Sequence, residues 1–241
     1  MSRISDANPE NLQALADSGA HILECYRVLQ KTTANVVGDV LKDQGEFFEW
    51  DHYPSGDVYD HETHSQYYYH AHPPEKRANK WGAEHGHFHT FLRPKGMPAN
   101  IEPAALDDYT PPDDPNDALT HFVGISMNQA GYPIRLFTTN RWVTGEVWYA
   151  ADTVISLLDR FEMDLTYPSW PVNIWLTHLL RLYRHEIEDL LVARDVQVKK
   201  WQAEHPGINV YEDRNLEITS IIDISVEDKI KTIQTALETA A

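Results

Sequence analysis

The stretch Glu84-His85-Gly86-His87-Phe88-His89-Thr90-Phe91 has a histidine at every second position. A β-strand points successive side chains to opposite faces, so His85, His87 and His89 are predicted to share one face. Just upstream, Tyr67-Tyr68-Tyr69-His70-Ala71-His72 repeats the spacing with two more histidines. Two runs with the same alternating spacing, in a chain with 13 histidines, are unlikely to arise by chance and indicate a shared site.

Antiparallel pairing of the two runs would place all these side chains on one sheet face. If His72 lies opposite His85, then His70 lies opposite His87 and Tyr68 opposite His89. Opposed Cβ atoms stand about 5 Å apart, which allows imidazole nitrogens to converge on one ion at roughly 2.0–2.1 Å each. A slip of one residue would destroy the arrangement. Glu84 points to the wrong face unless a bulge occurs at Gly86.

The pattern therefore predicts a transition-metal site. Imidazoles without thiolates suit iron, copper, zinc or nickel and disfavour magnesium and calcium. Three protein ligands would leave an open position for oxygen, water or substrate, as in catalytic sites. A metal-free polar active site and a histidine-lined core remain alternatives. The candidate ligands are the five strand histidines and the one that opens a later hairpin: His70, His72, His85, His87, His89 and His121.

Three further residues are candidate catalytic groups. Tyr68 is the one tyrosine of its run that can reach the histidines, and a phenol beside a metal can donate a proton. His52 precedes a turn in an aromatic stretch, and Arg141 could bind an anionic group of a substrate. Their structural alternatives are a core tyrosine, a surface histidine and an Arg–carboxylate pair. His178 and His185 are interpreted as solvated or interhelical residues.

Charge and composition exclude several classes of protein. The net charge is −17 with histidines neutral, which repels phosphate backbones and argues against nucleic-acid binding. Cys25 is the one cysteine, so an intramolecular disulfide and a cysteine-based metal site are excluded. The N-terminal residues lack an apolar signal region, and no run of 18 apolar residues suggests a membrane span. A cytoplasmic protein that acts on a small molecule is expected, and a homodimer is an open alternative.

The order of elements predicts an α+β fold. An antiparallel β-sheet would carry the histidine-rich face and pack with N-terminal and C-terminal helices. We interpret 1–241 as one domain with an N-terminal helical segment (1–45), a β-rich histidine core (46–145) and a mainly helical part (146–241). The histidine core includes an acidic, proline-rich loop over 98–119, which could form a lid.

Several elements can be placed individually. Residues 47–53 are β-prone and precede a turn at 54–57. Two β-runs flank Asn128–Gly131 and predict a hairpin. Apolar spacing predicts one long helix over 172–204, and Ser225 is expected to cap the last helix.

Four sequence motifs resemble those of an uncharacterised bacterial family of domains of unknown function. The resemblance covers residues 46–150 best and implies no particular activity. The motifs are Trp50-Asp-His-Tyr-Pro-Ser-Gly-Asp-Val-Tyr-Asp60, Tyr68-Tyr-His-Ala-His72, Glu84-His-Gly-His-Phe-His-Thr-Phe91 and Leu136-Phe-Thr-Thr-Asn-Arg-Trp-Val-Thr-Gly-Glu146.

Three functional hypotheses follow. The first is an iron- or copper-dependent oxidoreductase or oxygenase that acts on a small organic molecule, because an imidazole site beside tyrosines suits redox metals. The second is a zinc-dependent hydrolase or lyase with a metal-bound hydroxide as nucleophile. The third is a non-enzymatic protein that binds, stores or senses metal.

Overall fold

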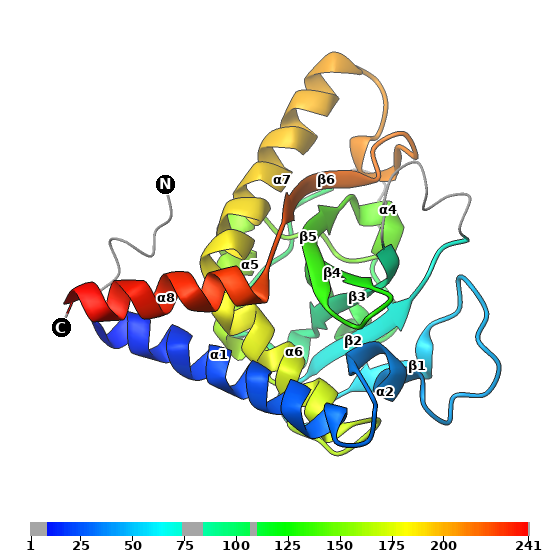
Figure 1. The fold of residues 1–241 in the computed structure, drawn as a ribbon. Helices are drawn as coiled ribbons and strands as arrows, with labels where there is room; N and C mark the ends of the chain where they lie inside the picture. Colours follow the sequence, from blue (N-terminus) through cyan, green and yellow to red (C-terminus); the bar gives the residue numbers. More distant parts are fainter. Residues whose placement is uncertain (1–8, 74–83, 107–109, 241) are drawn as a thin grey trace.

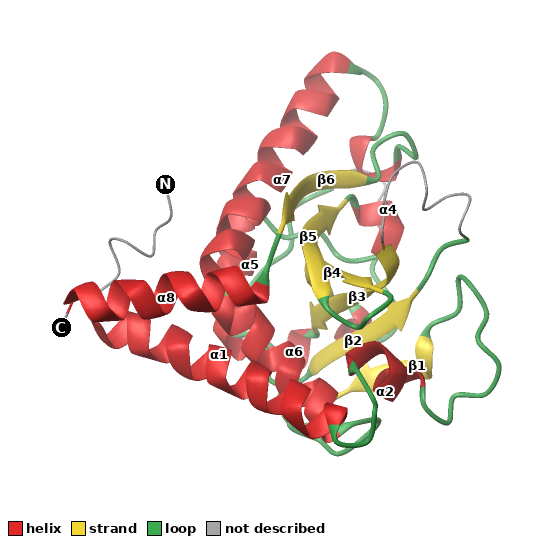
Figure 2. Cartoon of the chain, viewed as in Figure 1, coloured by secondary structure: helices red, strands yellow, loops and turns green. Residues whose placement is uncertain are grey.

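A six-stranded antiparallel sheet forms the centre of the computed structural model, which describes residues 9–73, 84–106 and 110–240 (Figures 1 and 2). The strands follow one another in chain order across the sheet, so each pairs with its sequence neighbour. They are β1 (Tyr53–Tyr59), β2 (Ser65–His70), β3 (Glu84–Leu92), β4 (Thr120–Asn128), β5 (Pro133–Thr139) and β6 (Ile218–Asp223).

Helices cover one side of this sheet and extend beyond it. Among the described residues they are α1 (Pro9–Gln30), α2 (Val36–Leu41), α4 (Arg141–Thr144), α5 (Ala151–Leu157), α6 (Trp170–Leu182), α7 (Arg184–Glu204) and α8 (Val226–Ala240). In Figure 1, α1 and α8 lie side by side, and α1 also packs along α6. Every helix in these ranges falls short of the length and apolar character that a membrane span requires. The chain is therefore an α+β protein, as predicted.

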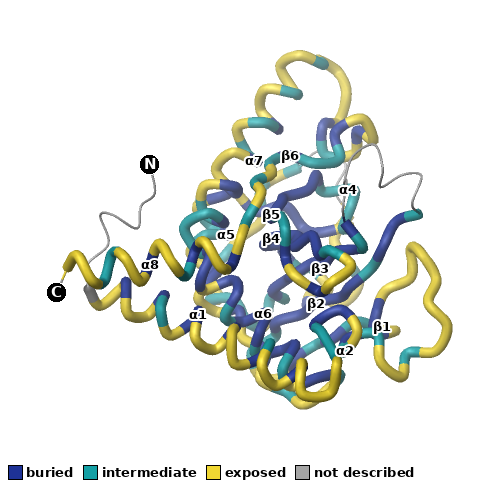
Figure 3. Tube along the Cα trace, viewed as in Figure 1, coloured by how far each residue is buried: buried dark blue, intermediate teal, exposed yellow. Residues whose placement is uncertain are grey.

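The helix layer packs on one set of alternating strand residues. Tyr67 and Phe88 are fully buried in the main hydrophobic core. The ring of Trp175, from α6, lies 5.8 Å from that of Phe88, and the Tyr67 hydroxyl donates to Asn173 Oδ1 at 2.6 Å. Figure 3 shows the central strands as the most buried part of the fold, with the outer sides of the helices exposed. The opposite face of the sheet is thus left for the other alternating set.

That opposite face carries Tyr68, His70, His87 and His89, and we call it the histidine face. Tyr68 pairs with His89 and His70 with His87 across β2 and β3, so the predicted antiparallel register is confirmed. The hairpin predicted around Asn128–Gly131 is also confirmed as β4 and β5. Ser225 Oγ accepts from Asp228 N at 3.2 Å, as expected of a helix cap.

Two predicted elements are wrong. The helix expected over 172–204 is two helices, because the chain turns at Tyr183 between α6 and α7. The strand expected over 47–53 is absent before Tyr53, the first residue of β1. The expected turn residues 54–57 lie inside β1, whose pairing with β2 is irregular between Tyr53 and Val58. In the acidic loop, the described residues contain one short helical turn, Pro115–Asp117, and the remainder falls outside them or lacks regular structure.

Candidate metal centre

Three histidines on two segments converge on the histidine face. One ring nitrogen from each of His70, His72 and His87 lies within 4.8 Å of the others, and we call these residues the histidine group. Nε2 of His70 is 2.6 Å from Nε2 of His87. His72 follows β2 and is 8% exposed, and His87 is 2% exposed. The arrangement offers nitrogen donors that could hold a metal ion.

A bulge in β3 decides which side chains accompany the histidine group. The pairing with β4 slips by one residue between Glu84 and Gly86, which leaves His85 as the extra residue. A bulge turns the residues before it to the opposite face. Glu84 therefore joins the histidine face, where its Oε1 accepts from Nδ1 of His87 at 2.7 Å.

The same bulge removes His85 from the histidine face. Its Nδ1 lies 2.7 Å from the Tyr69 hydroxyl, and its ring is 5.9 Å from that of Phe47. Tyr69 belongs to the alternating set that packs in the main core. The prediction that His85 shares the face of His87 and His89 is therefore wrong, because it assumed a regular strand.

Burial keeps His70 and His87 uncharged. Desolvation, followed by the proximity of His87 and His72, lowers the pKa of His70 far below its ordinary value. Desolvation likewise lowers the pKa of His87 well below 6.5. Because a neutral imidazole has one N–H and Glu84 accepts it from Nδ1, Nε2 of His87 carries a lone pair. This pairing of a carboxylate with a ligand imidazole is the usual support for a metal-binding histidine.

A second pair of histidines lies beside the histidine group. Nδ1 of His89 is 3.0 Å from Nε2 of His121, and the two residues are 1% and 2% exposed. Burial lowers the pKa of His121 to about 3 and that of His89 well below 6.5. The fully buried Glu146 holds the main chain here, since its Oε2 accepts from His121 N at 2.8 Å.

His52 and Tyr68 form the edge of the site. Their rings stack at 3.6 Å, and the His52 ring lies 5.8 Å from that of His70. His52 also lines a hollow of about 680 Å³, together with Phe48 and Asp51 among others. Burial raises the pKa of Tyr68 well above 10, so its hydroxyl stays protonated. The two predicted catalytic residues therefore lie between an open hollow and the histidine group.

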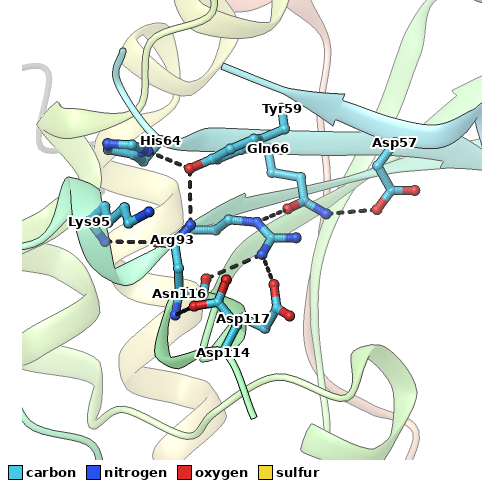
Figure 4. Close-up of polar contacts among 9 residues, drawn as sticks. All are labelled: Asp57, Tyr59, His64, Gln66, Arg93, Lys95, Asp114, Asn116 and Asp117. Atoms are coloured by element: carbon cyan, nitrogen blue, oxygen red, sulfur yellow. Dashed lines mark hydrogen bonds and ion pairs between the residues drawn. The ribbon is translucent and has the colours of Figure 1, made fainter. Parts of the chain in front are cut away.

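A chain of polar contacts begins at His52 and continues from Asp57 through Gln66 to Arg93 and Asp117, and Figure 4 shows the part from Asp57 onward. Nδ1 of His52 donates to Asp57 Oδ1 at 2.9 Å, and Asp57 Oδ2 accepts from Gln66 Nε2 at 2.7 Å. Gln66 Oε1 in turn accepts from Arg93 Nε at 2.5 Å, and Arg93 pairs with Asp117. The acidic segment thus connects to the edge of the site through β1, β2 and the end of β3.

The other candidate residues from the sequence contact other parts of the fold. Arg141, at the start of α4, pairs with Glu212, which is the structural alternative considered for it. His178 lies on α6 and stacks on His21 with ring centroids 4.0 Å apart, whereas His185 lies on α7. The structure therefore places these histidines among the helices.

Two contributors to the site were missed by the sequence reasoning. Trp50 stacks on His72 with ring centroids 4.5 Å apart and has a positive φ of 74°. Glu146 is the last residue of the fourth sequence motif, and this position was the one feature of the sequence that could have indicated its role. Desolvation raises its pKa to about 7, with Arg194 opposing the shift.

The fold and the site together define an α+β protein whose sheet carries a buried histidine group able to hold a metal ion. The chain belongs to a family described as "Domain of unknown function (DUF6969)", whose model matches residues 16–224. That membership agrees with the predicted resemblance to an uncharacterised family. No curated protein and no solved structure matches the chain.

Proposed function

We propose that this protein is a metal-dependent enzyme that uses iron or copper to oxidise a small organic molecule, with molecular oxygen as the electron acceptor. One observation carries the proposal: His70, His72 and His87 present nitrogens within 4.8 Å of one another, with His70 half-buried and the other two buried. Neutral imidazoles suit first-row transition metals. Three protein ligands leave coordination positions open, which is the arrangement that catalysis requires.

Surrounding residues support the fit of an ion. Glu84 orients His87 so that its Nε2 lone pair faces His70 Nε2 at 2.6 Å. A carboxylate in this position also offsets the positive charge of a buried ion. Trp50 stacks on His72 and shields it from solvent. A hydrophobic cover of this kind controls the access of water to a metal site.

A bound iron or copper ion would supply the electron transfer, and the chain's own residues would handle the proton and the substrate. The protonated Tyr68 hydroxyl can donate a hydrogen bond or a proton to a reacting group. His52 donates its Nδ1–H to Asp57, which leaves Nε2 free to accept a proton in the neutral ring. The hollow beside His52 provides room for a small molecule next to these groups.

A zinc-dependent hydrolase or lyase is the second candidate. The observation that favours it is the number of ligands, since three imidazoles with an open fourth position form a known type of catalytic zinc site. Zinc would generate a hydroxide nucleophile near neutral pH. The low exposure of His72 and His87 argues against a storage protein, which needs accessible and labile ligands.

Elemental analysis of protein purified without a histidine tag tests the proposal. We expect stoichiometric iron or copper in the wild type and its loss in His87→Ala. His178→Ala is the matched control, because His178 lies on α6 and stacks on His21 instead. Stoichiometric zinc would favour the second candidate. Absence of any transition metal after reconstitution, or loss of metal in His178→Ala alone, would refute a metal centre on the histidine group.

A further inference from the structure

The open hollow at the edge of the site is lined by three acidic residues and by no lysine or arginine of the part of the chain that the structure describes. Its volume of about 680 Å³ lies within the range of about 300–1,000 Å³ that small-molecule sites occupy. The three acids are Glu46, Asp51 and Asp57. Arg93 follows Asp57 in the chain of contacts of Figure 4, but it pairs with Asp117 and does not line the hollow. A cavity whose walls carry one sign of charge concentrates ligands of the opposite sign.

The polar groups that line the hollow are acceptors of hydrogen bonds. Glu46 and Asp51 are exposed, and their carboxylates form no ion pair or hydrogen bond with any residue that the structure describes. Asp57 accepts from Nδ1 of His52 at 2.9 Å and so holds that ring. The neutral His52 ring then presents a lone pair on Nε2, because Nδ1 carries its single proton. Two free carboxylates and an imidazole nitrogen bind a ligand that donates hydrogen bonds.

Aromatic rings stand exposed at the same place. Phe48 lines the hollow and is 54% exposed, and Trp50, two residues further on, is also exposed. The face of an aromatic ring is electronegative and attracts a cation placed over it. An anionic ligand would be repelled by the acids, and a purely apolar ligand would take them out of water without a partner. The rings and the carboxylates together therefore favour a cation with an apolar part.

The hydroxyl of Tyr68 indicates independently that a ligand completes this edge of the site. The residue is 6% exposed, yet its hydroxyl forms no hydrogen bond with any residue that the structure describes. Its ring stacks at 3.6 Å on that of His52, which lines the hollow. Desolvation, with the charges of Asp57 and Glu146, raises the pKa of Tyr68 and keeps it a neutral phenol. Buried hydroxyls normally have a partner, and a phenol oxygen can accept from a ligand as well as donate to it.

We propose that the hollow binds the substrate as a protonated organic amine, with its ammonium group near Glu46 and Asp51 and its apolar part against Phe48. An ammonium group donates hydrogen bonds and carries the charge that the acids attract. The His52 ring, at the inner end of the hollow, lies 5.8 Å from that of His70, so a substrate held here adjoins the histidine group. This inference rests on the proposed function, because it names the substrate class of the same site.

The competing explanation is an acidic surface that attracts cations without a specific site. Three probes of one shape and different charge separate the two explanations: phenethylamine, phenethyl alcohol and phenylacetate. Each is titrated into tag-free wild-type protein, both metal-stripped and reconstituted, and binding is followed by isothermal titration calorimetry. We expect the amine to bind at one site per chain and the alcohol and the acid to bind more weakly. The affinity for the amine should fall as salt is added, because salt screens the carboxylates.

Substitution places the amine in the hollow. Asp51→Asn should weaken its binding by about 2–5-fold, as the loss of one exposed ion pair does. Phe48→Ala should weaken it by a similar factor of about 2–5, through the loss of a cation–π contact. Glu62→Gln is the matched control, since it removes one negative charge from an exposed residue that does not line the hollow. This control should bind the amine as the wild type does.

The outcomes separate this inference from the proposed function. Failure of the amine to bind, equal or tighter binding of the alcohol or the acid, or equal amine affinities in Asp51→Asn and Glu62→Gln would overturn the inference. A stoichiometric iron or copper content would still uphold the proposed function in that event. Binding of the amine by a chain that holds no transition metal after reconstitution would refute the proposed function and uphold the ligand class. The comparison of the three probes uses the wild type alone, so it does not depend on whether a variant folds.

Discussion

At the scale of single residues, Glu84 is the side chain whose role the structure changes most. Its carboxylate holds Nδ1 of His87 at 2.7 Å inside the protein. Removal of a carboxylate that hydrogen-bonds a metal-binding histidine typically weakens metal binding by about 10–100-fold without abolishing it. We expect that loss in Glu84→Gln, measured by competition with a chelator of known affinity. The exposed Glu62→Gln is the control, and equal affinities in the two variants would contradict the assigned role.

His178 predicts a pH dependence of stability. Desolvation, with His21 and Arg181 nearby, lowers its pKa from 6.5 to about 4. Between these pH values His178 is protonated in the unfolded chain and neutral in the folded chain. The free energy of unfolding therefore falls as the pH drops from 6.5 to about 4. His178→Gln should lose less stability over this window in urea unfolding at pH 7 and pH 5. The exposed His61→Gln serves as control, and a wild-type slope in His178→Gln would disprove the prediction.

At the scale of elements, the bulge in β3 separates two histidines that look equivalent in the sequence. His85 faces Tyr69, while His87 belongs to the histidine group. We therefore expect His85→Ala to retain the full metal content and His87→Ala to lose it. Elemental analysis of the two purified variants checks this. Equal losses in both would mean that the strand is regular and that His85 is a ligand.

The register of β2 with β3 could be predicted, whereas the bulge could not. Alternation of two histidine runs restricts the pairing to one parity, and the observed partners His70 and His87 are those expected. The bulge depends on where Asn128 and Met127 meet the strand, and these residues come from a later part of the chain. Gly86 was the one local hint of a bulge in the sequence. The structure explains why glycine is needed there, because a Cβ at this position would lie 2.5 Å from the His70 carbonyl oxygen.

The break between α6 and α7 shows a similar limit. The apolar stripe continues through Tyr183 with helical spacing, and Tyr183 itself is 3% exposed. Periodicity cannot reveal a change of helix direction that keeps the same residues buried. Glu146 was not identified from the sequence for a related reason, since its contact with His121 arises from the fold and not from sequence spacing.

At the scale of the whole molecule, the helix layer and the histidine face have separate tasks. Tyr67, Phe88 and Trp175 lie in the main core, whereas the alternating residues on the other side are mostly histidines and polar groups. Residues that alternate along a strand belong to different layers. The sheet therefore anchors the candidate site rigidly through the core packed on its other face.

Because β2 and β3 both contribute to the histidine group, metal binding should stabilise the entire fold. A ligand that binds only the folded chain adds about 4 kcal/mol at roughly 1,000 times its Kd. For a chain of this size, that corresponds to a rise in Tm of roughly 8–16 °C. We expect this shift when iron or copper is added to metal-stripped protein and followed by calorimetry, and its reversal by a chelator. His87→Ala should show little shift, and an equal rise in that variant would place the stabilising ion elsewhere.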